Sequence, residues 1–337
     1  MDTMIDTRGL TKEFRSGKKT VTAVKDLDLH IADGEMVALL GPNGAGKSTT
    51  LRMLTTLLAP TSGSARVAGL DVTTDQHAVR RAIGYIGQGN SAGHSQRVID
   101  ELVVSGRAYG MSRGEARSRA GELLESLALS EQATRKVMTL SGGQRRRLDI
   151  AMGLIHSPGL LFLDEPSTGL DPQNRANLQQ HVVDLRRKHG ATVVLTTHYL
   201  DEADALAERI VVIDHGQVVA DDTPDSLKAE HAGDRIAMTF PRVEDAVRAS
   251  ERAAAAFPGA QLAHDGTSVD LEVAGGAGHV SALITDLTGA GIAPATVEVA
   301  RPTLDDVFLA LTGRSLREGR TDLRTDPITQ TTEEVAA

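Results

Sequence analysis

The chain has 337 residues, of which 40% are hydrophobic and 24% charged, and this composition is ordinary for a globular protein. Its net charge of −9 argues against nucleic acid as the main partner, because proteins that bind phosphate backbones usually carry a basic surface. There is no cysteine for disulfides or metal sites, no signal-peptide pattern, and no run of about 18 apolar residues that could span a bilayer. We therefore expect a protein that stays in the compartment where it is made.

Residues 1–232 show the alternation of strands and helices that is typical of a largely parallel α/β fold. The predicted strands are residues 27–31, 36–40, 66–72, 82–85, 159–163, 192–196 and 209–214. A helix is predicted at residues 47–58, directly after a glycine-rich loop. Residues 97–130 change to a helical pattern, in which Ser112 and Glu115 have the capping-box spacing that starts a helix at 113–127.

The pattern of strands and helices restarts after residue 232. The predicted elements are a strand at 235–240, a helix at 243–256, strands at 261–263 and 268–273, a helix at 279–290, a strand at 296–300 and a helix at 304–311. The βαββαβ order of the first six elements predicts a small ferredoxin-like α+β domain over residues 233–313. Residues 314–337 are polar and lack periodicity, so we expect a disordered tail.

A phosphate-binding loop follows the strand at 36–40. The run Gly41-Pro42-Asn43-Gly44-Ala45-Gly46-Lys47-Ser48 matches the pattern G-x-x-x-x-G-K-[ST] between an apolar strand and a helix. Glycines let backbone N–H groups converge on phosphate oxygens, and the helix N-terminus adds partial positive charge. Lys47 is expected to bridge the β- and γ-phosphates and Ser48 to ligate Mg²⁺. An ordinary glycine-rich turn is the alternative, and the complete pattern with its flanks disfavours it.

Two acidic residues end the apolar strand at 159–163. Asp164 is expected beside the phosphates, where it can hold Mg²⁺ or its water, and Glu165 is expected to polarise the attacking water. An apolar run that ends in two surface carboxylates is common, but the phosphate loop favours the catalytic interpretation.

The run Leu140-Ser141-Gly142-Gly143-Gln144 precedes a predicted helix. Ser141 and Gln144 have the spacing of a capping box, which is the structural interpretation. The two glycines also leave the helix N-terminus bare, as an anion site requires. A second phosphate site of this kind suggests that ATP is held from two sides.

Taken in chain order, these motifs resemble those of the ABC ATPases. The set comprises the Walker A loop at 41–48, the Q-loop glutamine Gln88, the signature at 140–144, Walker B at 160–165, the D-loop at 169–171 and the switch histidine His198. The resemblance covers residues 5–230. It implies a P-loop NTPase cassette with a RecA-like core, an antiparallel β subdomain and a helical subdomain at about 89–155.

The resemblance also implies a head-to-tail dimer of two copies, with ATP and Mg²⁺ between them. Ser141 and Gly143 of one copy would contact the γ-phosphate held by Lys47 of the other. The implied catalytic residues are Glu165, His198 and Gln88, and the implied metal residues are Ser48, Gln88 and Asp164. The implied nucleotide-binding residues are Phe14, which would stack on adenine, and Gly41, Pro42, Asn43, Gly44, Ala45, Gly46, Lys47, Ser48, Thr49, Ser141, Gly142, Gly143, Gln144 and Asp171.

Three segments are similar to the daunorubicin-resistance type of ABC exporter ATPase. They are residues 145–151, 196–204 and 302–308. This similarity implies a drug or antibiotic exporter that works with a separate ABC-2-type permease at the cytoplasmic face of the cell membrane. The three arginines at 145–147 are interpreted as a solvated helix face, so they do not argue for nucleic acid.

Residues 89–102 depart from the chemistry usual in that family, where this surface meets the membrane subunit. If Ile99 and Leu102 are exposed, we expect them to lie on the coupling surface, where substitutions would stop export while ATPase activity persists. Export of a lipid, polysaccharide or ion therefore remains open. A soluble ABC ATPase of DNA repair, chromosome organisation or translation is disfavoured, because the chain has one set of motifs and no long coiled coil between them.

Overall fold

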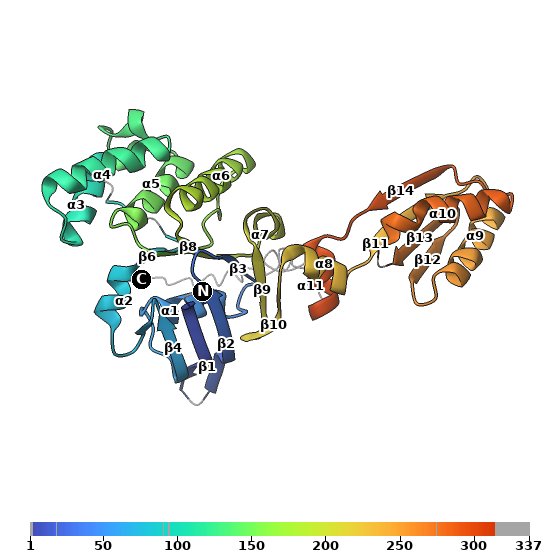
Figure 1. The fold of residues 1–337 in the computed structure, drawn as a ribbon, viewed down its shortest axis with the longest axis horizontal. Coiled ribbons are helices and arrows are strands. Elements are labelled where there is room, and N and C mark those ends of the chain that lie inside the picture. Colours follow the sequence, from blue (N-terminus) through green and yellow to red (C-terminus); the bar gives the residue numbers. More distant parts are fainter. Residues whose placement is uncertain (1–2, 18, 90, 94, 274, 314–337) are drawn as a thin grey trace, which may run out of the picture.

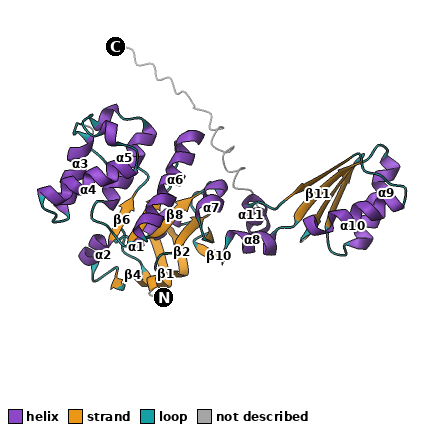
Figure 2. Cartoon of the chain, turned by 45° about the horizontal axis from the view of Figure 1, so that its top comes forward, coloured by secondary structure: helices purple, strands orange, loops and turns teal. Residues whose placement is uncertain are grey.

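The computed structural model describes residues 3–313, apart from residues 18, 90, 94 and 274. The predicted tail, residues 314–337, lies outside the described residues. Figure 1 shows a helical lobe above a central sheet, an antiparallel sheet below it, and a C-terminal unit that extends to one side. The same arrangement is seen from a second direction in Figure 2.

A six-stranded sheet forms the centre, in the order β10-β9-β3-β8-β7-β6. Its strands are β3 (Met36–Leu40), β6 (Ile83–Ile86), β7 (Leu160–Asp164), β8 (Thr192–Thr197), β9 (Arg209–Asp214) and β10 (Gln217–Asp222). All are parallel except β10, which pairs antiparallel with β9. Every residue of β3, β7 and β8 is buried, as expected for parallel strands covered on both faces. The carboxyl ends of β3, β6, β7 and β8 therefore meet at one edge.

An antiparallel sheet covers one face of the central sheet. Its order is β2-β1-β4-β5, with β1 at Thr3–Ser16, β2 at Lys19–Ala32, β4 at Ser62–Val67 and β5 at Leu70–Asp71. Ile5, Leu10 and Ile31 of this sheet share a core with Phe162 of β7. The prediction at residues 27–31 located only the end of β2, and β1 was not predicted.

Two helices, α1 (Lys47–Leu54) and α2 (Gln76–Ala82), pack in the same core as the antiparallel sheet. The other helices of the N-terminal unit cover the opposite face and build the lobe. They are α3 (Val98–Ala108), α4 (Arg113–Ser126), η1 (Ser130–Gln132), η2 (Val137–Thr139), α5 (Gly142–Leu154), α6 (Pro172–His189), α7 (Leu200–Leu206) and α8 (Pro224–His231). The predicted capping box of α4 is confirmed by reciprocal bonds between Ser112 and Glu115. Within the part of the chain that the structure describes, no helix combines the length and apolar content of a membrane crossing.

The C-terminal unit contains a second antiparallel sheet in the order β12-β13-β11-β14. Its elements are β11 (Asp234–Thr239), α9 (Val243–Ala256), β12 (Gln261–Asp265), β13 (Ser268–Val273), α10 (Gly276–Gly289) and β14 (Thr296–Ala300). Ile236 and Leu271 of the sheet, Ala249 of α9 and Leu287 of α10 share one core. The predicted order of strands and helices is present. The bounds of α9, β13 and β14 are as predicted, and those of β11, β12 and α10 differ by one to three residues at one or both ends.

The last described helix, α11 (Leu304–Thr312), returns from the C-terminal unit to the N-terminal one. It contacts α8 and α7, and Leu304, Val307 and Phe308 join the core on the helical side of the central sheet. The division into residues 1–232 and 233–313 stays a prediction. The packing nevertheless places α11 with the N-terminal unit, so the chain between β11 and β14 is tethered at both ends.

Phe308→Ala should destabilise the N-terminal unit, because Phe308 is 1% exposed in a core that includes Leu227 of α8. A buried Phe→Ala change costs about 3–5 kcal/mol of unfolding free energy. Leu309→Ala is the matched control, since Leu309 is 49% exposed and the change should stay within about 0.5 kcal/mol. Urea unfolding followed by circular dichroism measures both, and equal midpoints would contradict the packing of α11.

Candidate active site

The phosphate loop joins β3 to α1 and turns where only glycine fits. Gly46 is the N-cap of α1 with φ 106°, and no side chain caps the helix there. A Cβ on Gly46 would overlap the carbonyl oxygen of Ala23, and a Cβ on Gly41 would overlap that of Ile213. The N–H groups at the start of α1 are therefore left for an anion.

Lys47 is 4% exposed and folds back over its own loop. Its Nζ donates to the carbonyl oxygen of Gly41 at 2.6 Å and to that of Pro42 at 3.0 Å. Burial lowers the pKa of Lys47, while the negative charges of Glu165 and Asp164 oppose this shift. A partly desolvated cation thus faces two carboxylates at the mouth of the loop.

The three predicted metal residues lie in contact with one another. Ser48 Oγ donates to Asp164 Oδ1 at 2.8 Å, and Gln88 Nε2 donates to Ser48 Oγ at 3.2 Å. Each side chain carries an oxygen, and Mg²⁺ prefers oxygen ligands drawn from a few protein groups and substrate phosphates. These residues therefore fit a magnesium ion.

Thr196 is a fourth member of this cluster that was not assigned a role from the sequence. Its Oγ1 donates to Asp164 Oδ1 at 2.8 Å and accepts from the N–H of Glu165 at 3.0 Å. Asp164 pairs with Thr196 in the register of β7 and β8. The sequence signal that could have identified Thr196 is its position: it is a polar residue at the end of the strand predicted at 192–196, two positions before His198.

Glu165 and His198 face each other across the ends of β7 and β8. Glu165 Oε2 lies 3.5 Å from His198 Nδ1 and accepts from Thr168 Oγ1 at 3.1 Å. The contact with His198 is the main cause that lowers the pKa of Glu165, and burial opposes it. Glu165 is therefore a carboxylate at neutral pH, as a group that accepts a proton from water must be.

A cavity of about 310 Å³ lies over the phosphate loop. It is lined by Ala23, Asn43, Gly44, Ala45, Gly46, Lys47, Ser48, Thr49, Gln88 and Glu165. The structure thus brings the predicted loop, Gln88 and Glu165 together around one space. Phe14, 43% exposed on β1, does not line this cavity, and Lys12 Nζ lies 5.4 Å from its ring centroid.

The signature residues lie at the start of α5 and line no part of this cavity. The predicted capping box is present: Ser141 Oγ accepts from the N–H of Gln144, and Gln144 Oε1 accepts from the N–H of Ser141. Ser141 and Gly142 are exposed, whereas Gly143 packs against Asn174. Asp171 caps α6 by accepting from Asn174, and these bonds lower the pKa of Asp171.

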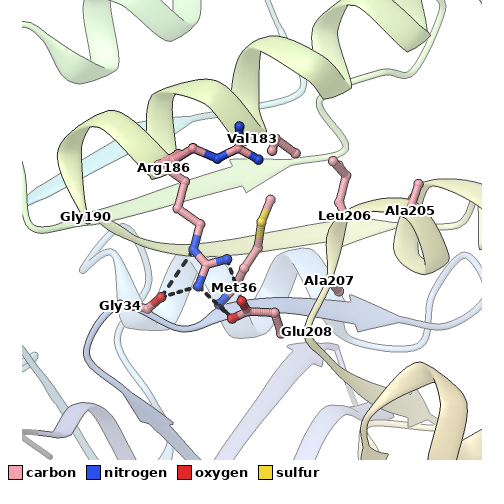
Figure 3. A pocket seen from close by; sticks show the side chains of 10 residues that line it. Gly34, Met36, Val183, Arg186, Gly190, Ala205, Leu206, Ala207 and Glu208 are labelled. Atoms are coloured by element: carbon pink, nitrogen blue, oxygen red, sulfur yellow. Dashed lines mark hydrogen bonds and ion pairs between the residues drawn. The ribbon is translucent and has the colours of Figure 1, made fainter.

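A second cavity of about 540 Å³ lies at the opposite edge of the central sheet (Figure 3). Arg186 from α6 donates there to Gly34 O and to both carboxylate oxygens of Glu208. The positive charge of its guanidinium is already balanced by the Glu208 carboxylate. None of the predicted site residues lines this cavity. Ligands of parallel sheets bind at the carboxyl ends of the strands, so the phosphate-loop cavity is the candidate active site.

The proteins that this chain resembles include ATP-binding proteins of drug resistance and of export. The family model described as ABC transporter matches residues 24–168. The chain is 41% identical over 320 residues to the daunorubicin/doxorubicin resistance ATP-binding protein DrrA of Streptomyces peucetius, covering 94% of this chain and 95% of the relative. It is also 41% identical to the Nod factor export ATP-binding protein I of Paraburkholderia xenovorans, over 64% of this chain and 70% of the relative.

A solved structure supports the same assignment. The ATP-binding cassette MJ0796, in a dimeric post-hydrolysis state bound to ADP and Pi, matches with a TM-score of 0.60 and 29% identity. The match covers 65% of this chain and 98% of that one. The N-terminal unit therefore has the fold of a nucleotide-binding cassette.

Proposed function

The chain belongs to the ATP-binding subunits of ABC transporters and is an ATPase, and we propose that it powers export of a hydrophobic drug or antibiotic. The observation that carries this proposal is the extent of the match to DrrA, which covers 94% of this chain. That match takes in the C-terminal unit and α11 as well as the cassette. The Nod factor relative matches 217 residues, which is 64% of the chain and slightly less than the length of residues 1–232.

In the proposed site, ATP lies over the phosphate loop with its β- and γ-phosphates at Lys47. Ser48, Asp164 and Gln88 hold Mg²⁺, which would neutralise phosphate charge during transfer. Glu165 accepts a proton from the attacking water, and His198, 3.5 Å from Glu165, contacts the γ-phosphate. Buried Lys47 supplies positive charge where the phosphates carry negative charge.

The proposed active unit is a head-to-tail dimer. Exposed Ser141 and Gly142 lie outside the cavity of their own chain, so a second copy is needed to bring them to ATP. The structural neighbour described above is dimeric with ADP and Pi bound. In this arrangement Gly143 and Gln144 at the start of α5, and Asp171 at the start of α6, lie where the chain meets the partner's nucleotide. Phe14 stacks on adenine.

We propose that residues 233–300 form a ferredoxin-like domain that serves assembly or regulation. The sheet order β12-β13-β11-β14 and the βαββαβ sequence support this proposal. A separate ABC-2-type permease would hold the dimer at the cytoplasmic face of the membrane. Export of a lipid, polysaccharide or ion is the second candidate, because the chain is also 41% identical, over 217 residues, to a protein of Nod factor export.

Drug export is tested by purifying the tagged full chain from membranes of its own cells and identifying the permease that accompanies it. The two proteins are then expressed together in a drug-sensitive bacterium, and daunorubicin accumulation is measured by fluorescence. We expect lower accumulation than in cells where the chain carries Lys47→Ala, because export needs ATP turnover. Equal accumulation, with ATPase activity intact, would point to another cargo.

A further inference from the structure

One arginine of the signature helix reaches out of the helical lobe to the edge of the central sheet. Arg146 of α5 is 7% exposed. Its Nε donates to Pro166 O at 2.8 Å, one terminal nitrogen donates to Gly87 O at 2.7 Å, and the other donates to Asp164 O at 3.3 Å. All three acceptors are backbone carbonyls, so the side chain anchors the backbone at two places: just after β6 and at the end of β7.

The three acceptors adjoin the two residues proposed to act on the attacking water. Gly87 directly precedes Gln88, and Asp164 and Pro166 flank Glu165 on either side. Glu165 has φ 48°, a backbone conformation that non-glycine residues rarely adopt and that persists only where the surroundings enforce it. Arg146 holds the carbonyl group of the residue before this unusual residue and that of the residue after it.

A second side chain of α5 holds the same loop further along. Asp149, one turn after Arg146, is 1% exposed, and its Oδ1 accepts from the N–H of Ser91 at 2.9 Å. Burial raises the pKa of Asp149, and its bond to Ser91 and the charge of Arg146 oppose that shift. The segment after β6 is therefore attached to α5 at residue 87 and at residue 91.

We propose that Arg146 is a positioning residue for ATP hydrolysis, which ties the backbone of Glu165 and Gln88 to the helix that carries the signature. Movement of α5 when the signature engages ATP would then be transmitted directly to both groups. This inference rests on the proposed roles of Glu165 and Gln88. It assigns Arg146 no contact with nucleotide.

Only arginine fits this position. Its planar guanidinium offers five donors in a fixed fork, enough to satisfy three carbonyls in different directions. A lysine has one nitrogen and cannot reach both loops in the same geometry. Without Arg146, buried carbonyls lose their partners, and a displacement of about 1 Å at a catalytic group can lower a rate about 100-fold.

The test compares Arg146→Ala and Arg146→Lys with Arg147→Ala in the full chain. Arg147 is a matched control, because its guanidinium also donates to backbone carbonyls, those of Leu127 and Ala128. It lies 3.5 Å from His181 as well, and none of these partners adjoins Glu165 or Gln88. We expect both Arg146 variants to lose about 10- to 100-fold in kcat while the Kd for a fluorescent ATP analogue changes less than about threefold. Arg147→Ala should keep kcat within a few-fold of wild type.

Chemical rescue separates positioning from a general folding defect. Methylguanidinium at millimolar concentration should restore part of kcat to Arg146→Ala, and it should not stimulate Arg146→Lys, Arg147→Ala or wild type. Normal kcat in Arg146→Ala, equal losses in Arg146→Ala and Arg147→Ala, or parallel loss of binding and turnover without rescue would overturn the inference. Normal hydrolysis by Glu165→Gln would instead overturn the proposed function, so the two failures are distinguishable.

Discussion

Lys47→Ala is expected to reduce ATP turnover at least about 100- to 1000-fold, the range for loss of one donor that stabilises transition-state charge. Among the described residues that line the phosphate-loop cavity, Lys47 is the only cation. Its removal takes away the side-chain cation that offsets the carboxylates of Asp164 and Glu165 beside the phosphates. Nucleotide affinity should also fall, because Lys47 contacts phosphate in the ground state as well.

The measurement is phosphate release from saturating MgATP by the purified full chain, alone and with its permease. Lys47→Met keeps most of the side-chain volume, so a similar loss in that variant assigns the effect to charge and not to the shape of the loop. Lys228→Ala is the control for loss of a lysine elsewhere, since Lys228 pairs with Asp204 near the surface of α8. Turnover close to wild type in Lys47→Ala would remove this residue from its proposed role.

The phosphate loop and the strand that ends in Asp164 were predictable because their signals are local. A contiguous glycine pattern between a strand and a helix allows few other structures, and five apolar residues followed by two acids identify a buried parallel strand. The contact between Ser48 and Asp164 then follows from topology, since β3, β8 and β7 are neighbours in the sheet. The cassette fold is thus predictable from its motifs.

The interpretation of residues 145–147 as a solvated helix face is wrong for Arg146. Successive residues of an α-helix point about 100° apart, so three consecutive arginines cannot all face solvent on a helix with one buried side. The sequence does not show which one turns inward, because the acceptors at residues 87, 164 and 166 come from other segments. Arginine side chains are mostly exposed in folded proteins, so three arginines in a row favour the interpretation as a solvated face when only the sequence is known.

The coupling role predicted for Ile99 and Leu102 depended on their exposure, and Leu102 does not meet that condition. Leu102 is fully buried and Ile99 is partly buried against the same core, whereas Val104 on the same helix is 60% exposed. The helical pattern gave α3 correctly, but it did not show which side faces the lobe. The position of α11 escaped prediction for the same reason, since its apolar stripe packs on α8, some 75 residues earlier in the chain.

Glu165→Gln should separate ATP binding from ATP hydrolysis more sharply than any other single change. The amide keeps the size of the side chain, but it cannot accept the proton of the attacking water. The contact with His198 lowers the pKa of Glu165, so the wild-type group is ready to act as a base at neutral pH, and its loss should reduce turnover at least about 100-fold. Lys47 and the phosphate loop are unchanged, so ATP should still bind.

An ATP-bound variant that cannot hydrolyse should accumulate as the head-to-tail dimer, because the nucleotide that joins the two copies is retained. Light scattering coupled to size-exclusion chromatography, with and without MgATP, should show a doubling of mass for Glu165→Gln. Glu208→Gln is the matched control, since Glu208 pairs with Arg186 at the opposite edge of the sheet and should keep wild-type turnover and mass (Figure 3). Normal hydrolysis by Glu165→Gln, or a monomer at saturating MgATP both alone and on the permease, would contradict a site in which Glu165 is the base and ATP is shared between two copies.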